Sequence, residues 1–210
     1  MIFDLNRNKA LPGSTSECPC CKSKIVAKCG SIKIWHWAHE SLGECDSNWE
    51  PMTQWRLDWQ AKVREELTEI IMGHHIADIR LTSGKVVEIQ HSTLPLEVVQ
   101  EREAFYGNMT WIFDGKDFFR RLVIKEKEFN GEPSHGFRFK NPRSYITGAT
   151  KYPFYIDFGD KVFRVSGMKK YENHSTVYDK DYTSYYFYGL LLENDQELHE
   201  EIFGSDYIGK

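Results

Sequence analysis

Apolar and polar residues alternate over residues 77–90 in the pattern of a β-hairpin. Thr82-Ser83-Gly84 in its middle suits a three-residue loop, in which a type I turn is followed by a glycine in the left-handed region. Such a loop pairs Leu81 with Lys85. A two-residue loop at Ser83-Gly84 is the alternative, and it shifts the pairing register by one residue.

The register decides which polar side chains share a face of this hairpin. With the three-residue loop, Asp78 lies opposite Glu88 and on the same face as Arg80 and Gln90, while Ile79, Val87 and Ile89 face the core. Two adjacent carboxylates repel unless a cation lies between them, and hard oxygen ligands suit Mg²⁺ or Mn²⁺. The hairpin therefore indicates either a metal site able to polarise a phosphate and activate water, or an ordinary hairpin with a solvated acidic face.

The same patterning predicts a helix on each side of the hairpin. The first spans about Glu50 to Ile71, with Trp55 and Trp59 starting an apolar stripe at three- and four-residue steps, and it ends at Gly73. The second spans residues 95–105, and a strand follows at 109–113. Helix, hairpin, helix and strand in this order are typical of an α/β core built on a mixed sheet.

The rest of the chain predicts a β-rich C-terminal region. Residues 126–142 are polar and contain glycine and proline, which indicates a loop that links this region to the core. Residues 152–158 and 161–165 read as two strands around Gly159-Asp160. The aromatic run at residues 182–188 suits either core packing or stacking on single-stranded bases beside Lys169 and Lys170.

Cysteines crowd into the first 45 residues, which in an intracellular chain indicates a metal site. Cys18 and Cys21 have the spacing of a knuckle, in which a tight turn aims two thiolates at one zinc ion. His39 and Cys45 are the favoured second pair, and His36 in place of Cys45 is the alternative. Reduced structural cysteines without metal would also fit this composition. Zinc here would be structural, because so short a segment cannot form a large core.

Composition narrows the class of protein only partly. A formal net charge of -4 over 210 residues does not suit a general coat for nucleic acid, so phosphate binding needs local Lys and Arg clusters. No apolar run reaches the length of a membrane span, and the N-terminus lacks a signal-peptide pattern, so we expect a cytoplasmic protein without membrane contact. No Walker-type loop or dinucleotide fingerprint is present, which weakens nucleotide hydrolysis and redox chemistry as functions.

An ordered set of motifs resembles the CoiA-like competence nucleases over about residues 15–114. The motifs are Cys18-Pro19-Cys20-Cys21, His36-Trp37-Ala38-His39, Glu50, His75-Ile76-Ala77-Asp78, Glu88-Ile89-Gln90-His91-Ser92 and Glu101-Arg102-Glu103-Ala104-Phe105-Tyr106. The resemblance implies a zinc-finger-like segment over residues 1–48 and a restriction-endonuclease-like PD-(D/E)XK core with helices flanking a mixed sheet over 49–125. The β-rich region predicted from the strand patterns then occupies residues 126–210.

Roles for individual residues follow from this resemblance. It implies that Asp78 is the core aspartate, that Glu88 is the second metal carboxylate, and that Gln90 stands where many such nucleases have lysine. The Ile89 carbonyl would complete the Mg²⁺ or Mn²⁺ site, and Glu50 would supply an acid from the first helix. His75 and Arg102 would be accessory residues near the phosphate.

Two positions in the first helix depart from the family pattern. Where the resemblance implies Trp-His and then Trp-Lys, the chain has Trp55-Arg56 and Trp59-Gln60. Arg56 can bind phosphate but cannot act as a general base, and Gln90 cannot carry a proton. Water activation would then rest on metal-bound hydroxide, assisted by His75 or a neighbouring phosphate.

The sequence therefore predicts a metal-dependent phosphodiesterase acting on DNA. The alternatives are a catalytically inactive nucleic-acid-binding adaptor in DNA uptake or recombination, and a protein-interaction module. The sequence leaves open whether the substrate is single-stranded, duplex or branched DNA, or RNA. Cutting both strands of a duplex with one active site per chain would favour a homodimer.

Overall fold

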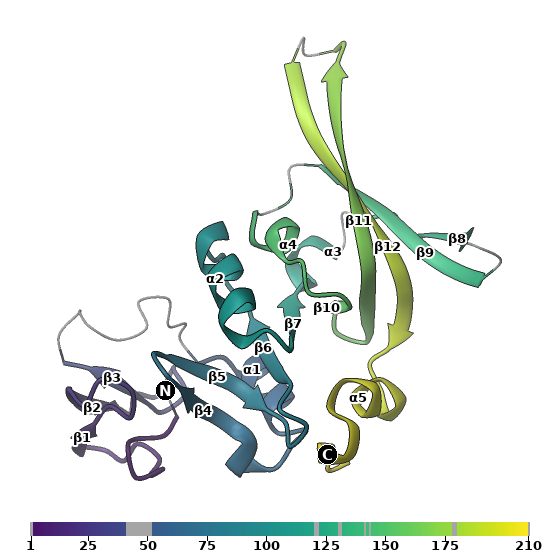
Figure 1. Cartoon of the computed structure of the whole chain (residues 1–210). Helices are drawn as coiled ribbons and strands as arrows, with labels where there is room; N and C mark the ends of the chain where they lie inside the picture. The colour runs from purple at the N-terminus through teal and green to yellow at the C-terminus, as the bar shows by residue number, and fades with distance from the viewer. Residues whose placement is uncertain are drawn as a thin grey trace. The chain divides into compact units, whose positions relative to one another are not determined.

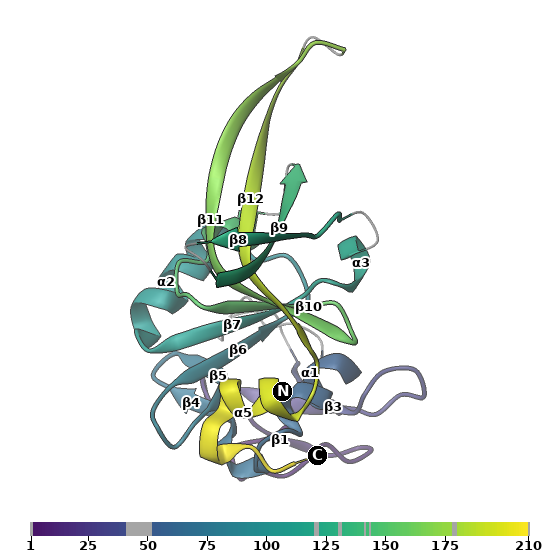
Figure 2. The ribbon, with the colours of Figure 1, turned by 90° about the vertical axis from the view of Figure 1, so that its right-hand side faces the viewer.

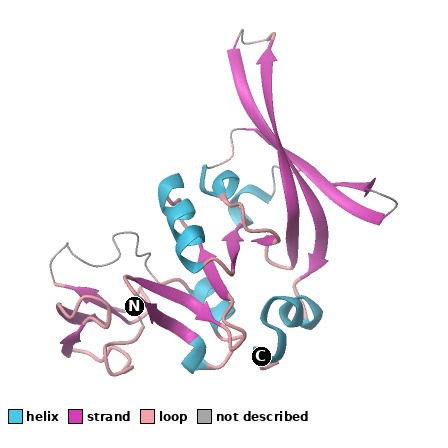
Figure 3. Ribbon diagram, viewed as in Figure 1, coloured by secondary structure: helices cyan, strands magenta, loops and turns pink. Residues whose placement is uncertain are grey.

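The computed structural model describes residues 2–40, 52–119, 122–129, 132–140, 142, 144–177 and 180–209. The chain forms two compact units: unit 1 comprises Met1–Val87 with Ser205–Lys210, and unit 2 comprises Glu88–Gly204 (Figure 1). Both units combine strands with helices, so the protein is mixed α/β (Figure 3). No helix among the described residues is long and apolar enough to span a membrane.

Unit 1 contains a three-stranded antiparallel sheet and a β-ladder preceded by a short helix. The sheet consists of β1 (Thr15–Glu17), β2 (Lys24–Lys28) and β3 (His36–His39), in that order. The remaining elements are α1 (Gln54–Gln60), the 3-10 turn η1 (Glu65–Leu67), β4 (Thr68–Met72), β5 (His75–Arg80) and β6 (Val86–Gln90). β4, β5 and β6 pair antiparallel in sequence order, and β6 continues across the boundary between the units.

The β5–β6 hairpin has the loop that the sequence predicts. Leu81 N–H donates to the Lys85 carbonyl over 2.9 Å, and Ile79 pairs with Val87. Gly84 adopts a φ of 83°, the left-handed conformation that closes a three-residue loop. The two-residue alternative is therefore wrong. The loop is also tied to the chain's C-terminal segment, because Thr82 N–H donates to Asp206 Oδ2 over 2.7 Å.

The predicted first helix is wrong over its second half. α1 begins after Thr53, whose Oγ1 accepts a hydrogen bond from Arg56 N–H, and it ends at Gln60. The chain then forms β4, which pairs with β5 from Thr68 opposite Ile79 to Met72 opposite His75. β-branched residues favour this extended conformation, and the ladder's hydrogen bonds override an apolar spacing that also suited a helix.

Unit 2 is built on a mixed sheet with helices packed beside it (Figure 2). Its elements are α2 (Leu96–Tyr106), β7 (Met109–Asp114), α3 (Lys116–Phe119), β8 (Lys125–Phe129), β9 (Glu132–Lys140), α4 (Ser144–Gly148), β10 (Phe154–Asp157), β11 (Lys161–Ser175), β12 (Lys180–Glu193) and α5 (Gln196–Phe203), followed by a 3-10 turn η2 (Gly204–Asp206) at the boundary. The strand order is β7-β10-β11-β12-β9-β8, with β10 parallel to β7 and antiparallel to β11.

Several predicted elements of unit 2 are confirmed with nearly the expected bounds. The predicted helix over residues 95–105 is α2, the predicted strand over 109–113 is β7, and the two strands around Gly159-Asp160 are β10 and the start of β11. Buried aromatic side chains join these strands: Phe113 lies 5.5 Å from Phe154, and Phe137 lies 4.9 Å from Phe163, centroid to centroid. An aromatic core thus stabilises the mixed sheet.

The predicted loop over residues 126–142 is wrong, because β8 and β9 form a hairpin there and β9 pairs with β12. Glycine suggested a loop, but Gly136 lies within β9 and makes room for a ring. A Cβ at that position would lie 1.9 Å from Tyr186 Oη. The alternation of Phe137 and Phe139 with Arg138 and Lys140 is the period-two signal that outweighs the turn formers.

Candidate functional site

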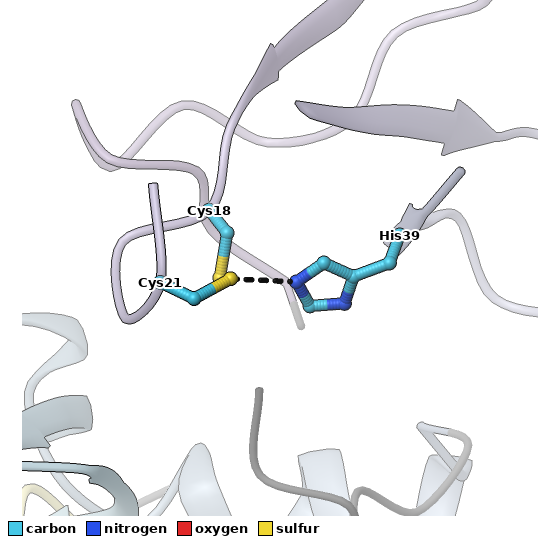
Figure 4. A group of neighbouring side chains, drawn as sticks. All are labelled: Cys18, Cys21 and His39. Atoms are coloured by element: carbon cyan, nitrogen blue, oxygen red, sulfur yellow. Dashed lines mark hydrogen bonds between the residues drawn. The ribbon is translucent and has the colours of Figure 1, made fainter. Parts of the chain in front are cut away.

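A cluster of cysteine and histidine side chains lies beside the three-stranded sheet of unit 1. The ligand atoms of Cys18, Cys21 and His39 all lie within 4.8 Å of one another, and Cys21 Sγ is 3.3 Å from His39 Nε2 (Figure 4). The turn is closed by Lys22 N–H, which donates to the Cys18 carbonyl over 3.0 Å. Lys22 adopts a φ of 63°, so the chain reverses tightly and directs both thiols to one side.

The structure shows which of the alternative zinc ligands lie beside Cys18 and Cys21. His36 and His39 are an odd number of residues apart on β3, so they project from opposite faces of the strand. His36 Nδ1 lies 2.7 Å from the Ile34 carbonyl, whereas His39 joins the two cysteines. Cys20 also points elsewhere, since its thiol donates to the His74 carbonyl over 3.6 Å. Cys45 lies outside the described residues.

The electrostatics of the cluster favour a thiolate. Burial raises the pKa of the Cys21 thiol, but hydrogen bonds with Ser23, His39 and Cys18 outweigh burial and lower the pKa to about 6. Thiolate sulfur and imidazole nitrogen are the donors that a tetrahedral zinc ion takes. The three residues therefore fit zinc in donor type and in proximity.

Asp78 lies on β5 in unit 1 and is held by two side chains of α1. It is only 3% exposed. The buried guanidinium of Arg56 donates to Asp78 Oδ1 in a close ion pair, and Gln60 Nε2 donates to the Asp78 carbonyl over 3.2 Å. The two α1 residues at which the chain departs from the CoiA-like resemblance thus both contact the predicted core aspartate.

Glu88 lies in the unit 2 part of β6 and is only 4% exposed. The buried Arg102 of α2 donates from Nη1 to Glu88 Oε2 over 3.0 Å. The ion pair offsets part of the cost of burying the two charges. Each arginine predicted to bind phosphate therefore contacts a predicted metal-binding carboxylate, one pair in each unit. The alternative prediction of an ordinary hairpin with a solvated acidic face is therefore wrong, because both acids are buried.

The remaining predicted site residues are placed as follows. Gln90 is buried, and its Nε2 donates to the Ser92 carbonyl over 2.8 Å. Ile89 is buried in β6, and His75 is buried in β5 opposite Met72. Glu50 lies outside the described residues.

Glu103 is a buried carboxylate whose role the sequence analysis missed. It is 3% exposed on α2 and accepts hydrogen bonds from Trp111 Nε1 over 3.0 Å and Thr150 N–H over 2.8 Å, with a further close contact from Thr150 Oγ1. The sequence does contain one signal for its burial, because Glu103 follows the buried Val99 by one helical turn and therefore lies on the same face of the helix. The carboxylate ties α2 to β7 and to the segment after α4, so its role is structural.

Replacing Glu103 should destabilise the protein. We expect Glu103→Ala to lower the free energy of unfolding by about 3 kcal/mol, because it leaves several buried donors without their acceptor. Glu103→Gln keeps one acceptor oxygen and should lose less. Gln100→Ala, at an exposed position of the same helix, should change stability by about 0.5 kcal/mol or less. Urea unfolding checks these values, and equal losses for Ala at both positions would contradict the role.

The fold and the cluster together define a mixed α/β protein with an N-terminal segment that joins cysteine and histidine side chains. Residues 5–48 match the family model described as "Competence protein CoiA, N-terminal domain". The N-terminal segment is thus similar to that domain, and the match spans the three clustered side chains. No curated protein and no solved structure matches the chain.

Proposed function

We propose that this protein is a metal-dependent nuclease of the CoiA type, with a restriction-endonuclease-like core, that hydrolyses phosphodiester bonds in DNA. The supporting observation is the deep burial of Asp78 and Glu88 on a hairpin with a three-residue loop. Only with a loop of this length does the two-residue side-chain period put both acids on one face of the hairpin. Buried carboxylates with a specific charge partner, as Arg56 is for Asp78 and Arg102 for Glu88, are frequent at functional sites.

Asp78, Glu88 and the Ile89 carbonyl would hold Mg²⁺ or Mn²⁺, with Glu50 supporting a second ion or its water. A divalent ion in such oxygen ligands polarises a phosphate and lowers the pKa of its bound water. The chain's own contribution is positioning: Arg56 and Gln60 orient Asp78, and Arg102 orients Glu88. Gln90 would orient water or phosphate, and His75 would assist proton movement.

A structural zinc ion is part of the same proposal. Cys18, Cys21 and His39 would supply its ligands, with Cys45 as the favoured fourth. A tetrahedral ion would hold together β1–β3, whose own apolar cluster of Ala10, Cys18, Ile25 and Trp37 is small.

A second candidate function is a nucleic-acid-binding adaptor without catalysis. One observation favours it: both acids already have an arginine partner, and Arg56 with its fixed charge stands where the family resemblance implies a titratable histidine. An arginine can balance a buried carboxylate permanently, so these pairs would also suit a core that has lost its metal.

Cleavage of labelled single-stranded, duplex and branched DNA with Mg²⁺ or Mn²⁺ distinguishes the two functions. The nuclease proposal expects products that require the metal and disappear with EDTA. Retained DNA binding with no product from any substrate would support the adaptor instead. Neither binding nor cleavage would favour a protein-interaction module.

A further inference from the structure

Four neighbouring strands of unit 2 place charge on one face of their sheet. β8, β9, β12 and β11 pair antiparallel in that order, so directly paired residues project to the same side. Arg138 pairs with Tyr186, and Tyr186 pairs with Lys169. We refer to the set on this side as the basic face: Lys125, Lys127, Arg138, Lys140, Lys169, Tyr171, Tyr182, Tyr186 and Tyr188.

Charge is sharply divided between the two sides of these strands. All five cationic residues of the basic face are exposed, and none has an ion pair with a carboxylate among the described side chains. Among the residues of these strand segments whose burial is described, the acids alternate to the opposite face: Glu126, Glu128, Glu172 and Asp181. There Lys170 Nζ lies 2.6 Å from Glu172 Oε1. An acidic chain therefore carries a local basic surface.

Tyrosine rings lie among these cations. Lys127 Nζ is 4.6 Å from the ring centroid of Tyr186, Lys140 Nζ is 4.8 Å from that of Tyr182, and Arg138 Cζ is 5.0 Å from that of Tyr171. These cation–π contacts hold positive charge next to aromatic surface.

Two glycines let the rings lie along the sheet. A Cβ at Gly136 would lie 1.9 Å from Tyr186 Oη, and a Cβ at Gly167 would lie 2.2 Å from Tyr188 Oη. The phenol ends of Tyr186 and Tyr188 thus occupy the space that side chains would take on the neighbouring strands. Aromatic rings at the surface of a sheet are the groups on which the bases of a single strand stack.

We propose that the basic face binds single-stranded DNA. Its lysines and Arg138 would contact phosphates, and its tyrosines would stack on bases that are free of a duplex partner. The choice of DNA over RNA rests on the proposed function, whereas binding itself requires neither Asp78 nor Glu88. A duplex fits less well, because its bases are already stacked on one another and only its phosphates could use this surface.

Two neighbouring lysines provide a matched test. Lys169 lies on the basic face and Lys170 on the opposite face, so Lys169→Ala and Lys170→Ala differ in side rather than in charge. Anisotropy of a labelled 20-nucleotide oligothymidine, measured with full-length protein in EDTA, should show weaker binding for Lys169→Ala. Its salt slope should fall by about 0.7, the value for one phosphate contact to a single strand. Lys170→Ala should match the wild type.

Tyr171→Ala should weaken binding at least about fivefold, the lower limit for loss of one stacked base. His174→Ala, on the opposite face of the same strand, should leave affinity unchanged. Equal effects for Lys169 and Lys170, no binding by the wild type, or tighter binding to duplex or to oligouridine would overturn the proposal. Binding that depends on the basic face without cleavage would refute the nuclease alone, and cleavage with normal binding by Lys169→Ala and Tyr171→Ala would refute this inference alone.

Discussion

Asp78→Ala and Glu88→Ala should each lower the rate of metal-dependent DNA cleavage by at least about a thousandfold. The proposed role of both carboxylates is to hold the ion that activates water, and metal catalysis supplies several kcal/mol of barrier reduction. Initial rates with a saturating labelled substrate measure the effect. DNA binding should survive both substitutions, because the basic face is formed by β8, β9, β11 and β12, and neither acid belongs to these strands.

Stability must be separated from catalysis in this experiment. Removing Asp78 leaves the buried Arg56 without its ion-pair partner, which typically costs about 3–5 kcal/mol. The pair Asp78→Asn with Arg56→Gln removes both charges and should fold better than Asp78→Ala while remaining inactive. Glu97→Gln, at an exposed acid of α2, serves as the control with full activity. Wild-type rates in any of the Asp78 or Glu88 variants would contradict the assignment.

Loss of the proposed zinc site should unfold the N-terminal segment. Structural zinc contributes on the order of 10 kcal/mol to small metal-stabilised domains, and β1–β3 have only a small apolar cluster of their own. We expect zinc in the purified wild type and none in Cys18→Ser, and we expect the variant to become sensitive to limited proteolysis before residue 40. Atomic emission and mass spectrometry of the fragments measure both effects.

Cys29→Ser provides the matched control, because Cys29 packs against the same apolar cluster but lies outside the group formed by Cys18, Cys21 and His39. It should retain zinc and resist the protease. Zinc retained in full by Cys18→Ser, or a wild-type protein purified without zinc under non-chelating conditions, would refute this part of the account.

Local signals in the sequence were sufficient for the central hairpin. Thr82-Ser83-Gly84 has the residues that one loop type needs, and the register at Ile79 and Val87 follows from it. They were insufficient for β4, because its short apolar run Ile70-Ile71-Met72 fits the end of a helix as well as a strand. The pairing of β4 with β5 is a tertiary interaction, and it decided the conformation there.

The candidate sites show the same limit. Spacing was enough to place Cys18 beside Cys21, and the odd separation of His36 and His39 was the signal that distinguishes them once β3 is known. The partners of Arg56 and Arg102 could not be found this way. Both arginines have the chemistry to bind phosphate, and only the packing of α1 against β5 and of α2 against β6 turns them to carboxylates.

The β8–β9 hairpin escaped prediction because its signals conflict. Gly136 and Pro133 indicate a turn, while alternating aromatic and cationic residues indicate a strand. Gly136 lies within a strand because any larger residue there would collide with the ring of Tyr186, which lies on a strand about 50 residues later. The basic face depends on that long-range pairing, so its charge separation becomes visible only in the register of four strands.

The central claim is tested most directly by cleavage of labelled DNA with Mg²⁺ in wild type and in Glu88→Gln, compared at matched thermal stability. A nuclease should give metal-dependent products as the wild type and none as Glu88→Gln, with DNA binding retained by both. Equal cleavage by the two proteins, or no cleavage by either while both still bind DNA, would contradict the nuclease proposal.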